Sequence, residues 1–456
     1  MKNYILTVGL EIHAELKTRT KMFCDSKNDT NETRPNTNIC PICTGYPGTL
    51  PVINKEAVKS VLRLGLAVGG EVADYTEFDR KNYFYPDIPK GYQISQYKYP
   101  LVTGGSLNDV ALTRIHLEED TAKSTHTTEF SFLDFNRAGV PLMELVTEPV
   151  IKTAEQAADF ARELQLVLRY LRMSDANMEK GEMRVEANVS VRNDQTTMTN
   201  DQLGTKVEVK NLNSFKSVER AIKYEFERQT KLLMGGGEVV QETRGWNEEK
   251  GETFSQRVKE ESHDYRYFPD PDLSKLFIKE IEEFDRGVLE ASLPELPHNK
   301  RSRYKKDFGI KDQDIEVYVR DEEWGRFFEE VAVALEDHEL VKLASNYITS
   351  DLKIPISTES LVEVIMMISR GEISSRGAKD ILRHIQEVGG EPKQIAKEKN
   401  LLQISDIEVL NKLVAEVLKE NTGAPIQFLV GQVMKKSKNR ANPVMLQKLF
   451  LEMLDH

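Results

Sequence analysis

The chain has 456 residues, enough for roughly two to four domains with a hydrophobic core. Its formal net charge of −12 argues against a protein that coats nucleic acid through bulk charge, but a local basic patch is compatible with it. No apolar run approaches the ~18–20 residues of a membrane span, and Glu11 and His13 lie where a signal peptide would stay apolar. Three cysteines do not build a disulfide framework. We therefore expect a cytoplasmic protein with no membrane contact.

The first predicted strand covers residues 8–16, VGLEIHAEL. Residues two apart lie on one face of a strand, so Glu11, His13 and Glu15 share a face. Leu10 and Ile12 lie on the other face. A charged face suggests a wet surface that holds something positive, although any half-solvated antiparallel strand alternates in this way.

Three cysteines, Cys24, Cys40 and Cys43, lie in a predicted loop rich in Pro, Asn and Gly. Cys40 and Cys43 form a CxxC pair, and a structural Zn²⁺ site needs four ligands. Ser26 stands where a fourth thiol could have been. The segment is compatible with a three-thiol zinc site completed by an outside ligand, and equally with a segment that binds no metal.

Residues 54–68 have helical spacing, and Gly69-Gly70 is expected to end that helix. The next segment, FDRKNYFYPDIPKGYQISQY, interleaves the cations Arg80 and Lys81 with tyrosines. Aromatic rings can stack a base while cations take phosphate, so the segment is a candidate nucleotide or tRNA-end pocket. A loop that packs its aromatic residues on the domain is the alternative. Residues 262–273, SHDYRYFPDPDL, have a similar composition, so the two loops could flank one cleft.

Acidic residues alternate in the two strand-like runs between residues 114 and 149. His116 and Glu118 are two apart, and so are Glu144, Val146 and Glu148. Together with the first strand, these runs could converge on a hard cation. Mg²⁺ takes oxygen ligands, usually one or two carboxylates together with substrate phosphates.

Thr153 begins the clearest long helix of the first half, with Gln156 at the capping-box distance. Two further strand-like runs, EMRVEANVSVRN and TKVEVKNLNSF, bring lysines beside carboxylates, with Lys206 and Lys210 on one face. An ATP site needs cations for the phosphate oxygens and carboxylates for the magnesium, so these lysines are candidate phosphate contacts. Cross-strand charge pairing is the alternative. A second long helix is predicted over 216–234 and ends at three glycines.

Pro294 and Pro297 mark a boundary beyond which helical patterns dominate. We therefore predict an α+β protein with three parts: a mixed, β-rich cradle domain over 1–292, a helical domain over 293–400 and a small helical tail over 401–456. The tail is basic, which is typical of a surface that contacts a phosphate backbone, although a solvated helix face would look the same; its cations are Lys435, Lys436, Lys438, Arg440 and Lys448.

Several motifs are absent. The chain has no GxxxxGK[ST] loop, so a Walker motif does not hold ATP if ATP is used. It also lacks GxGxxG after a strand, HExxH and GxSxG, and no arrangement suggests a hydrolase nucleophile.

Taken together and in this order, the longer motifs resemble one family over essentially the whole chain. They are GLEIHAEL, NTNICPICTGYPGTLPVINKEAV, FDRKNYFYPDIPKGYQISQY, HLEEDTAKSTH, DFNRAGVPLMELVTEP, GTKVEVKNLNSF, QETRGW and DYRYFPDPDL, followed by FLVGQVMK near the end. The family is the B subunit of the tRNA-dependent amidotransferase. The resemblance implies ATP-dependent amidation of mischarged Glu-tRNA(Gln), Asp-tRNA(Asn) or both, through an acyl phosphate. It also implies two partners: an amidase, the A subunit, which releases ammonia from glutamine, and the small C subunit.

The resemblance also implies site residues. The family's Mg²⁺ ligands correspond to Glu11 and His13 in GLEIH, Glu119 in HLEED and Glu144 in PLMEL. Glu119 is not on the face shared by His116 and Glu118, and a bulge or a strand end would reconcile the two. The cysteine segment departs from the zinc-bearing members, which have CxC where this chain has Cys-Asp-Ser. A non-catalytic protein that docks tRNA in the same complex is the alternative function, and an independent carboxylate–amine ligase for a small metabolite is a second.

Overall fold

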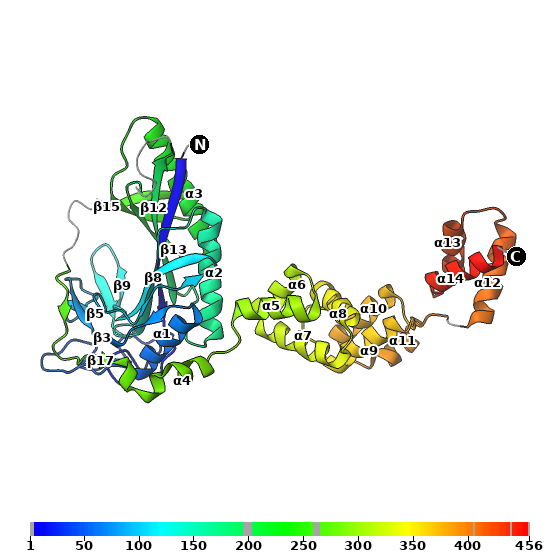
Figure 1. Ribbon diagram of the computed structural model, residues 1–456, viewed down its shortest axis with the longest axis horizontal. Coiled ribbons are helices and arrows are strands. Elements are labelled where there is room, and N and C mark those ends of the chain that lie inside the picture. Colours follow the sequence, from blue (N-terminus) through cyan, green and yellow to red (C-terminus); the bar gives the residue numbers. More distant parts are fainter. Residues whose placement is uncertain (1–3, 195–202, 259–264, 405, 438–439, 455–456) are drawn as a thin grey trace. The chain divides into compact units, whose positions relative to one another are not determined.

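The computed structural model describes residues 4–194, 203–258, 265–404, 406–437 and 440–454. The chain forms two compact units, Met1–Leu296 and Pro297–His456. Within the described residues, no helix has both the length and the apolar character needed to cross a membrane. Strands dominate the first unit and helices the second (Figure 1), which confirms the predicted α+β class. The finer boundaries at 292/293 and 400/401 stay predictions.

A ten-stranded mixed sheet organises the first unit. Its order is β15-β14-β13-β12-β1-β11-β8-β6-β2, with β7 paired to β8, and all pairings are antiparallel except that of β13 with β14. The strands are β1 (Tyr4–Glu15), β2 (Glu71–Val72), β6 (Val102–Thr103), β7 (Ser106–Leu107), β8 (Val110–Glu119), β11 (Pro141–Thr147), β12 (Met183–Asn193), β13 (Val207–Leu212), β14 (Glu242–Asn247) and β15 (Glu252–Val258).

One face of this sheet is apolar, because the apolar residues alternate with polar ones along its central strands. Leu10 and Ile12 of β1 are fully buried, as are Ala187 and Val189 of β12. They pack in one core with the helices α1 (Lys55–Ala67), α2 (Ala154–Tyr170) and α3 (Phe215–Met234). The opposite, polar face of the same strands is therefore left for the site.

The three helices begin and end close to their predicted residues. Asn54, Thr153 and Ser214 cap their first turns by accepting hydrogen bonds from backbone N–H groups. Gln156 does lie at the capping-box distance, but its side chain accepts from the backbone N–H of Lys152, one residue before the cap.

Smaller strands surround the central sheet. β4 (Asp79–Asn82) pairs with both β5 (Tyr92–Ser95) and β16 (Phe268–Pro269), which brings the two predicted aromatic loops side by side. Two further pairs are β9 (Lys123–His126) with β10 (Ser131–Asp134) and β3 (Tyr75–Thr76) with β17 (Leu276–Phe277). The short helices η1 (Ile278–Glu280), η2 (Glu282–Phe284) and α4 (Arg286–Ala291) follow.

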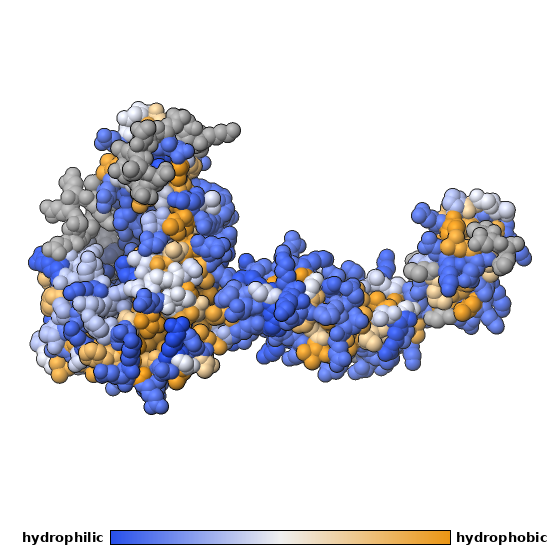
Figure 2. Space-filling view, in the orientation of Figure 1, coloured by the Kyte–Doolittle hydropathy of each residue, from blue (hydrophilic) through white to orange (hydrophobic). Residues whose placement is uncertain are grey.

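The second unit consists of helices, and hydrophilic residues cover most of its visible face (Figure 2). An aromatic core holds its first part, in which Tyr304, Tyr318 and Phe328 are fully buried and the last two stack with ring centroids 4.3 Å apart. The helices are α5 (Pro297–Phe308), α6 (Asp312–Arg320), α7 (Glu322–Leu335), α8 (His338–Asp351), α9 (Thr358–Ser369), α10 (Ser375–Val388) and α11 (Pro392–Glu398).

The last three helices have a hydrophobic cluster of their own, which includes Leu410, Val414, Leu429 and Phe450. They are α12 (Ile407–Glu420), α13 (Ile426–Lys436) and α14 (Pro443–Leu454). Of the predicted basic residues of the tail, Lys436 forms ion pairs with Glu416 and Glu420, and Lys438 lies outside the described residues.

Phe328 should contribute strongly to the stability of the helical unit. Phe328→Ala leaves a cavity among buried rings and should lower the free energy of unfolding of this unit by about 3–5 kcal/mol. Chemical denaturation followed by circular dichroism measures the change. Val333→Ala on the same helix is the matched control, because Val333 is 77% exposed and its truncation should change the free energy little. Equal effects of the two substitutions would contradict the aromatic core.

Candidate metal and phosphate site

A row of ionisable side chains crosses three adjacent strands on the polar face of the sheet. The register of β1 with β11 pairs His13 with Glu144, and the register of β11 with β8 pairs Glu144 with His116. Glu11 is two residues before His13, and Glu118 is two residues after His116, so both lie on this face. The strand alternation seen in the sequence therefore converges on one cluster.

Glu144 lies at the centre of this cluster. Its Oε2 is 3.4 Å from His13 Nε2 and 3.3 Å from His116 Nε2. His13 Nε2 is also 3.6 Å from Glu118 Oε1 and 4.0 Å from Glu11 Oε1. His116, Glu118 and Glu144 are all buried, so these contacts lie away from bulk water.

Charge compensation decides which of these groups are ionised. Burial alone would lower the pKa of His13, but the hydrogen bond to Glu144 and the nearby carboxylates raise the pKa to about 9. Burial alone would raise the pKa of Glu144, yet His116 and His13 hold that pKa well below its usual range. Burial, followed by the charge of Glu144, raises the pKa of the Glu11 carboxyl. Glu144 is thus the carboxylate that the cluster keeps ionised.

The donor atoms fit a divalent cation. Two overlapping groups, Glu11–His13–Glu144 and His116–Glu118–Glu144, each place three ligand atoms within 4.8 Å of one another. His116 Nδ1 and Glu118 Oε2 are buried and have no hydrogen-bond partner among the described residues, which leaves them available to a ligand. A carboxylate-rich donor set suits Mg²⁺, which is a hard cation.

The predicted phosphate-binding cations have different surroundings. Lys81 Nζ is 3.8 Å from Glu118 Oε2 and therefore borders the cluster. Lys210 Nζ is 2.9 Å from Glu186 Oε2, and Glu186 pairs with Glu11 in the register of β1 and β12, so Lys210 lies on the other side.

Arg80 and Lys206 are not brought to the cluster in the same way. Arg80 forms ion pairs with Asp270, at 2.8 Å, and with Asp272, at 3.1 Å, and its guanidinium covers the ring of Tyr92. Lys206 is exposed and lies just before β13. Of the predicted cations, Lys81 and Lys210 are thus the ones beside the carboxylates.

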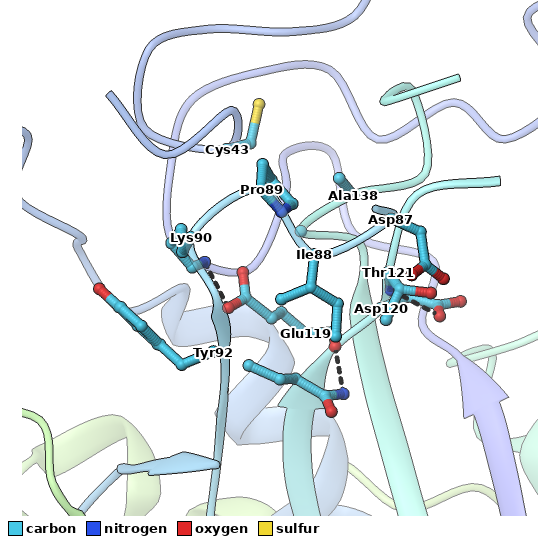
Figure 3. A pocket seen from close by; sticks show the side chains of 12 residues that line it. Cys43, Asp87, Ile88, Pro89, Lys90, Tyr92, Glu119, Asp120, Thr121 and Ala138 are labelled. Atoms are coloured by element: carbon cyan, nitrogen blue, oxygen red, sulfur yellow. Dashed lines mark hydrogen bonds and ion pairs between the residues drawn. The ribbon is translucent and has the colours of Figure 1, made fainter. Parts of the chain in front are cut away.

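Glu119 lies on the other face of β8 and does not join the cluster. Its carboxylate is paired with Lys90 and accepts a hydrogen bond from the backbone N–H of Ile94 at 2.9 Å. It lines a small pocket together with Lys90, Tyr92 and Cys43 (Figure 3). No bulge or strand end turns Glu119 toward Glu144. Glu118 and His116, which the alternation had indicated, are the residues of β8 that reach the cluster.

The cysteines meet in a second group. The sulfur atoms of Cys24, Cys40 and Cys43 all lie within 4.8 Å of one another. Ser26 Oγ is 3.8 Å from Cys43 Sγ, and the fully buried Lys21 places its Nζ 3.7 Å from the same sulfur. Three thiols and a hydroxyl beside a fixed ammonium do not match the four nitrogen or sulfur ligands of a structural zinc. The group therefore fits Zn²⁺ poorly.

Comparison with known proteins places this arrangement in a family. Residues 6–282 match the model described as the GatB/GatE catalytic domain, and residues 327–454 match the model described as the GatB domain. A protein from Persephonella marina, named as the B subunit of aspartyl/glutamyl-tRNA(Asn/Gln) amidotransferase, is 42% identical over 483 residues, 98% of each chain. A protein of the same name from Brevibacillus brevis is 42% identical over 487 residues, 100% of each chain. A third from Synechocystis sp. is 40% identical over 495 residues, 99% of this chain and 98% of the relative. The chain therefore belongs to the family of aspartyl/glutamyl-tRNA(Asn/Gln) amidotransferase B subunits.

Proposed function

We propose that this chain carries out the ATP-dependent amidation of a mischarged tRNA, as the names of its relatives indicate. The substrate is Glu-tRNA(Gln), Asp-tRNA(Asn) or both. The observation that supports this most is the position of Glu144, a buried carboxylate shared by two three-ligand groups on the polar face of the sheet. A tRNA-docking protein without chemistry would have no use for such a cluster.

The reaction needs activation because a free carboxylate is a poor electrophile. In the proposed first step, an oxygen of the Glu or Asp side chain attacks the γ-phosphorus of ATP, which gives an acyl phosphate and ADP. In the second, ammonia attacks the acyl carbon, loses a proton, and phosphate leaves with the C–O electron pair. Positioning and neutralisation of charge dominate catalysis of phosphoryl transfer.

The residues divide into two groups by this chemistry. Glu11, His13 and Glu144, together with Glu118 or His116 of β8, would hold Mg²⁺. When bound, Mg²⁺ neutralises charge on the phosphate oxygens. We propose Glu118 rather than Glu119 as the carboxylate from β8, because the carboxylate of Glu119 is already committed to Lys90.

Lys81 and Lys210 flank the carboxylates and are the proposed contacts for phosphate oxygens. Burial alone would lower the pKa of both lysines, but the surrounding carboxylates raise it. Both side chains therefore stay cationic, as phosphate binding requires. Arg80 would act more indirectly, because its ion pairs with Asp270 and Asp272 hold β4 beside β16.

The word "subunit" in the relatives' names supports a complex with other chains. We propose two partners in the cytoplasm: an amidase, the A subunit, which supplies ammonia from glutamine, and the small C subunit. The basic residues of the tail would contact tRNA outside its acceptor end. Lys435 and Lys448 are the candidates for phosphate contact there, since Lys436 is already paired with Glu416 and Glu420.

The carboxylate of Glu144 should be required for catalysis. Glu144→Gln keeps the shape but removes the charge between His13 and His116, so transamidation should fall by ~10²-fold or more. The assay uses the full complex with mischarged tRNA, glutamine and ATP, and tRNA binding should change little. Glu148→Gln is the matched control near the end of the same strand, where Glu148 accepts from Thr113 at 2.8 Å. Full amidation by Glu144→Gln would remove the proposed role.

The two neighbouring carboxylates of β8 should differ in their effect on metal affinity. Titration of Mn²⁺ as a stand-in for Mg²⁺, followed by electron paramagnetic resonance of the full chain, measures this directly. Glu118→Gln should weaken the affinity by about 10–100-fold, and Glu119→Gln should weaken it far less, because Glu119 faces Lys90. Loss of Mn²⁺ affinity in Glu119→Gln alone would show that Glu119 is the ligand.

A further inference from the structure

Five tyrosines from three segments of the chain form a continuous aromatic array. The pairing of β4 with β5 and with β16 brings these segments together. From one end to the other, the ring centroids are separated by 6.2 Å, 5.7 Å, 6.0 Å and 4.5 Å, and the order is Tyr85, Tyr83, Tyr265, Tyr267 and Tyr97. The last two rings lie almost parallel, at 11°, so they form a stacked pair.

This array is not a hydrophobic core. Tyr97 is 63% exposed and Tyr85 is 58% exposed. The aromatic cluster of the helical unit, built on Tyr304 and Tyr318, is by contrast completely buried. Exposed aromatic residues that gather at one place mark a binding surface, because their burial by a ligand gains free energy that solvent exposure does not.

The array borders the carboxylate cluster. Lys81 Nζ is 5.2 Å from the ring centroid of Tyr265 and 3.8 Å from Glu118 Oε2, so one ammonium contacts both features. Tyr267 is near enough to the cluster that burial, together with the charges of Glu118 and Glu144, raises the pKa of its phenol to about 12. A ligand with a flat ring and a phosphate chain could therefore engage both features at once.

The chemistry selects an adenine nucleotide. Flat π-faces stack nucleobases, and a cation at the edge of the array suits the phosphate or sugar that follows the base. We propose that the stacked pair Tyr97–Tyr267 is the platform for an adenine base, belonging either to ATP or to the 3′-terminal adenosine of tRNA. This inference rests on the proposed function, since it supplies a base subsite to the same cation and phosphate site.

The test uses the full complex and the separate KM values for ATP and for mischarged tRNA. Tyr97→Ala removes the outer ring and should raise one of these KM values by ~10-fold, with a small change in kcat. Tyr97→Phe keeps the ring and should behave like the original protein. Tyr46→Ala is the matched control, since Tyr46 is also 63% exposed but does not belong to the array.

The two sources of the base give different results. A raised KM for ATP alone assigns the platform to ATP, and a raised KM for tRNA alone assigns it to the terminal adenosine. The inference is overturned if Tyr97→Ala leaves both KM values unchanged, if Tyr97→Phe is as impaired as Tyr97→Ala, or if Tyr46→Ala has the same effect. A normal Tyr97→Ala beside an inactive Glu144→Gln would remove the base platform alone and leave the proposed function standing.

Discussion

Buried charge on the polar face of the sheet is the constraint on which the site depends. Placing Glu118 and Glu144 away from water costs free energy unless opposite charge or hydrogen bonds compensate. His13 and His116 offset part of that cost, and Lys81 offsets another part from the edge. Among the described residues, orphaned donor and acceptor atoms remain in the cluster, so the compensation is incomplete without a bound ligand.

The sheet makes this arrangement possible by separating two tasks. The apolar residues of β1 and β12 bury against α1, α2 and α3 and fix the strands in place. The register of β1, β11 and β8 then aligns His13, Glu144 and His116 across neighbouring strands. A shift of any strand by one residue would turn its ionisable side chains into the core, so apolar packing on one face specifies the geometry of the other.

Strand alternation in the sequence predicted which residues share a face, including His116 and Glu118. Family resemblance favoured Glu119 instead, but the structure pairs that carboxylate with Lys90 on the opposite face of β8. The pairing of strands far apart in the chain could not be predicted, because registers depend on long-range packing and not on local pattern. For the same reason, the similarity of the two aromatic loops suggested a shared cleft, while the contact between Tyr97 and Tyr267 needed the pairing of β4 with β16. The fit to zinc depended on the ammonium of Lys21, whose burial among the thiols no motif indicates.

The central claim is that carboxylates and histidines from three strands hold one divalent cation beside the transferred phosphate. Anomalous diffraction from crystals of the complex with Mn²⁺ and a non-hydrolysable ATP analogue tests it most directly. The account predicts an anomalous peak within coordination distance of Glu144 and at least one of its neighbours Glu11, His13 and Glu118, with the γ-phosphate on the same ion. A fully occupied manganese and nucleotide on another surface, with no peak beside Glu144, would contradict it.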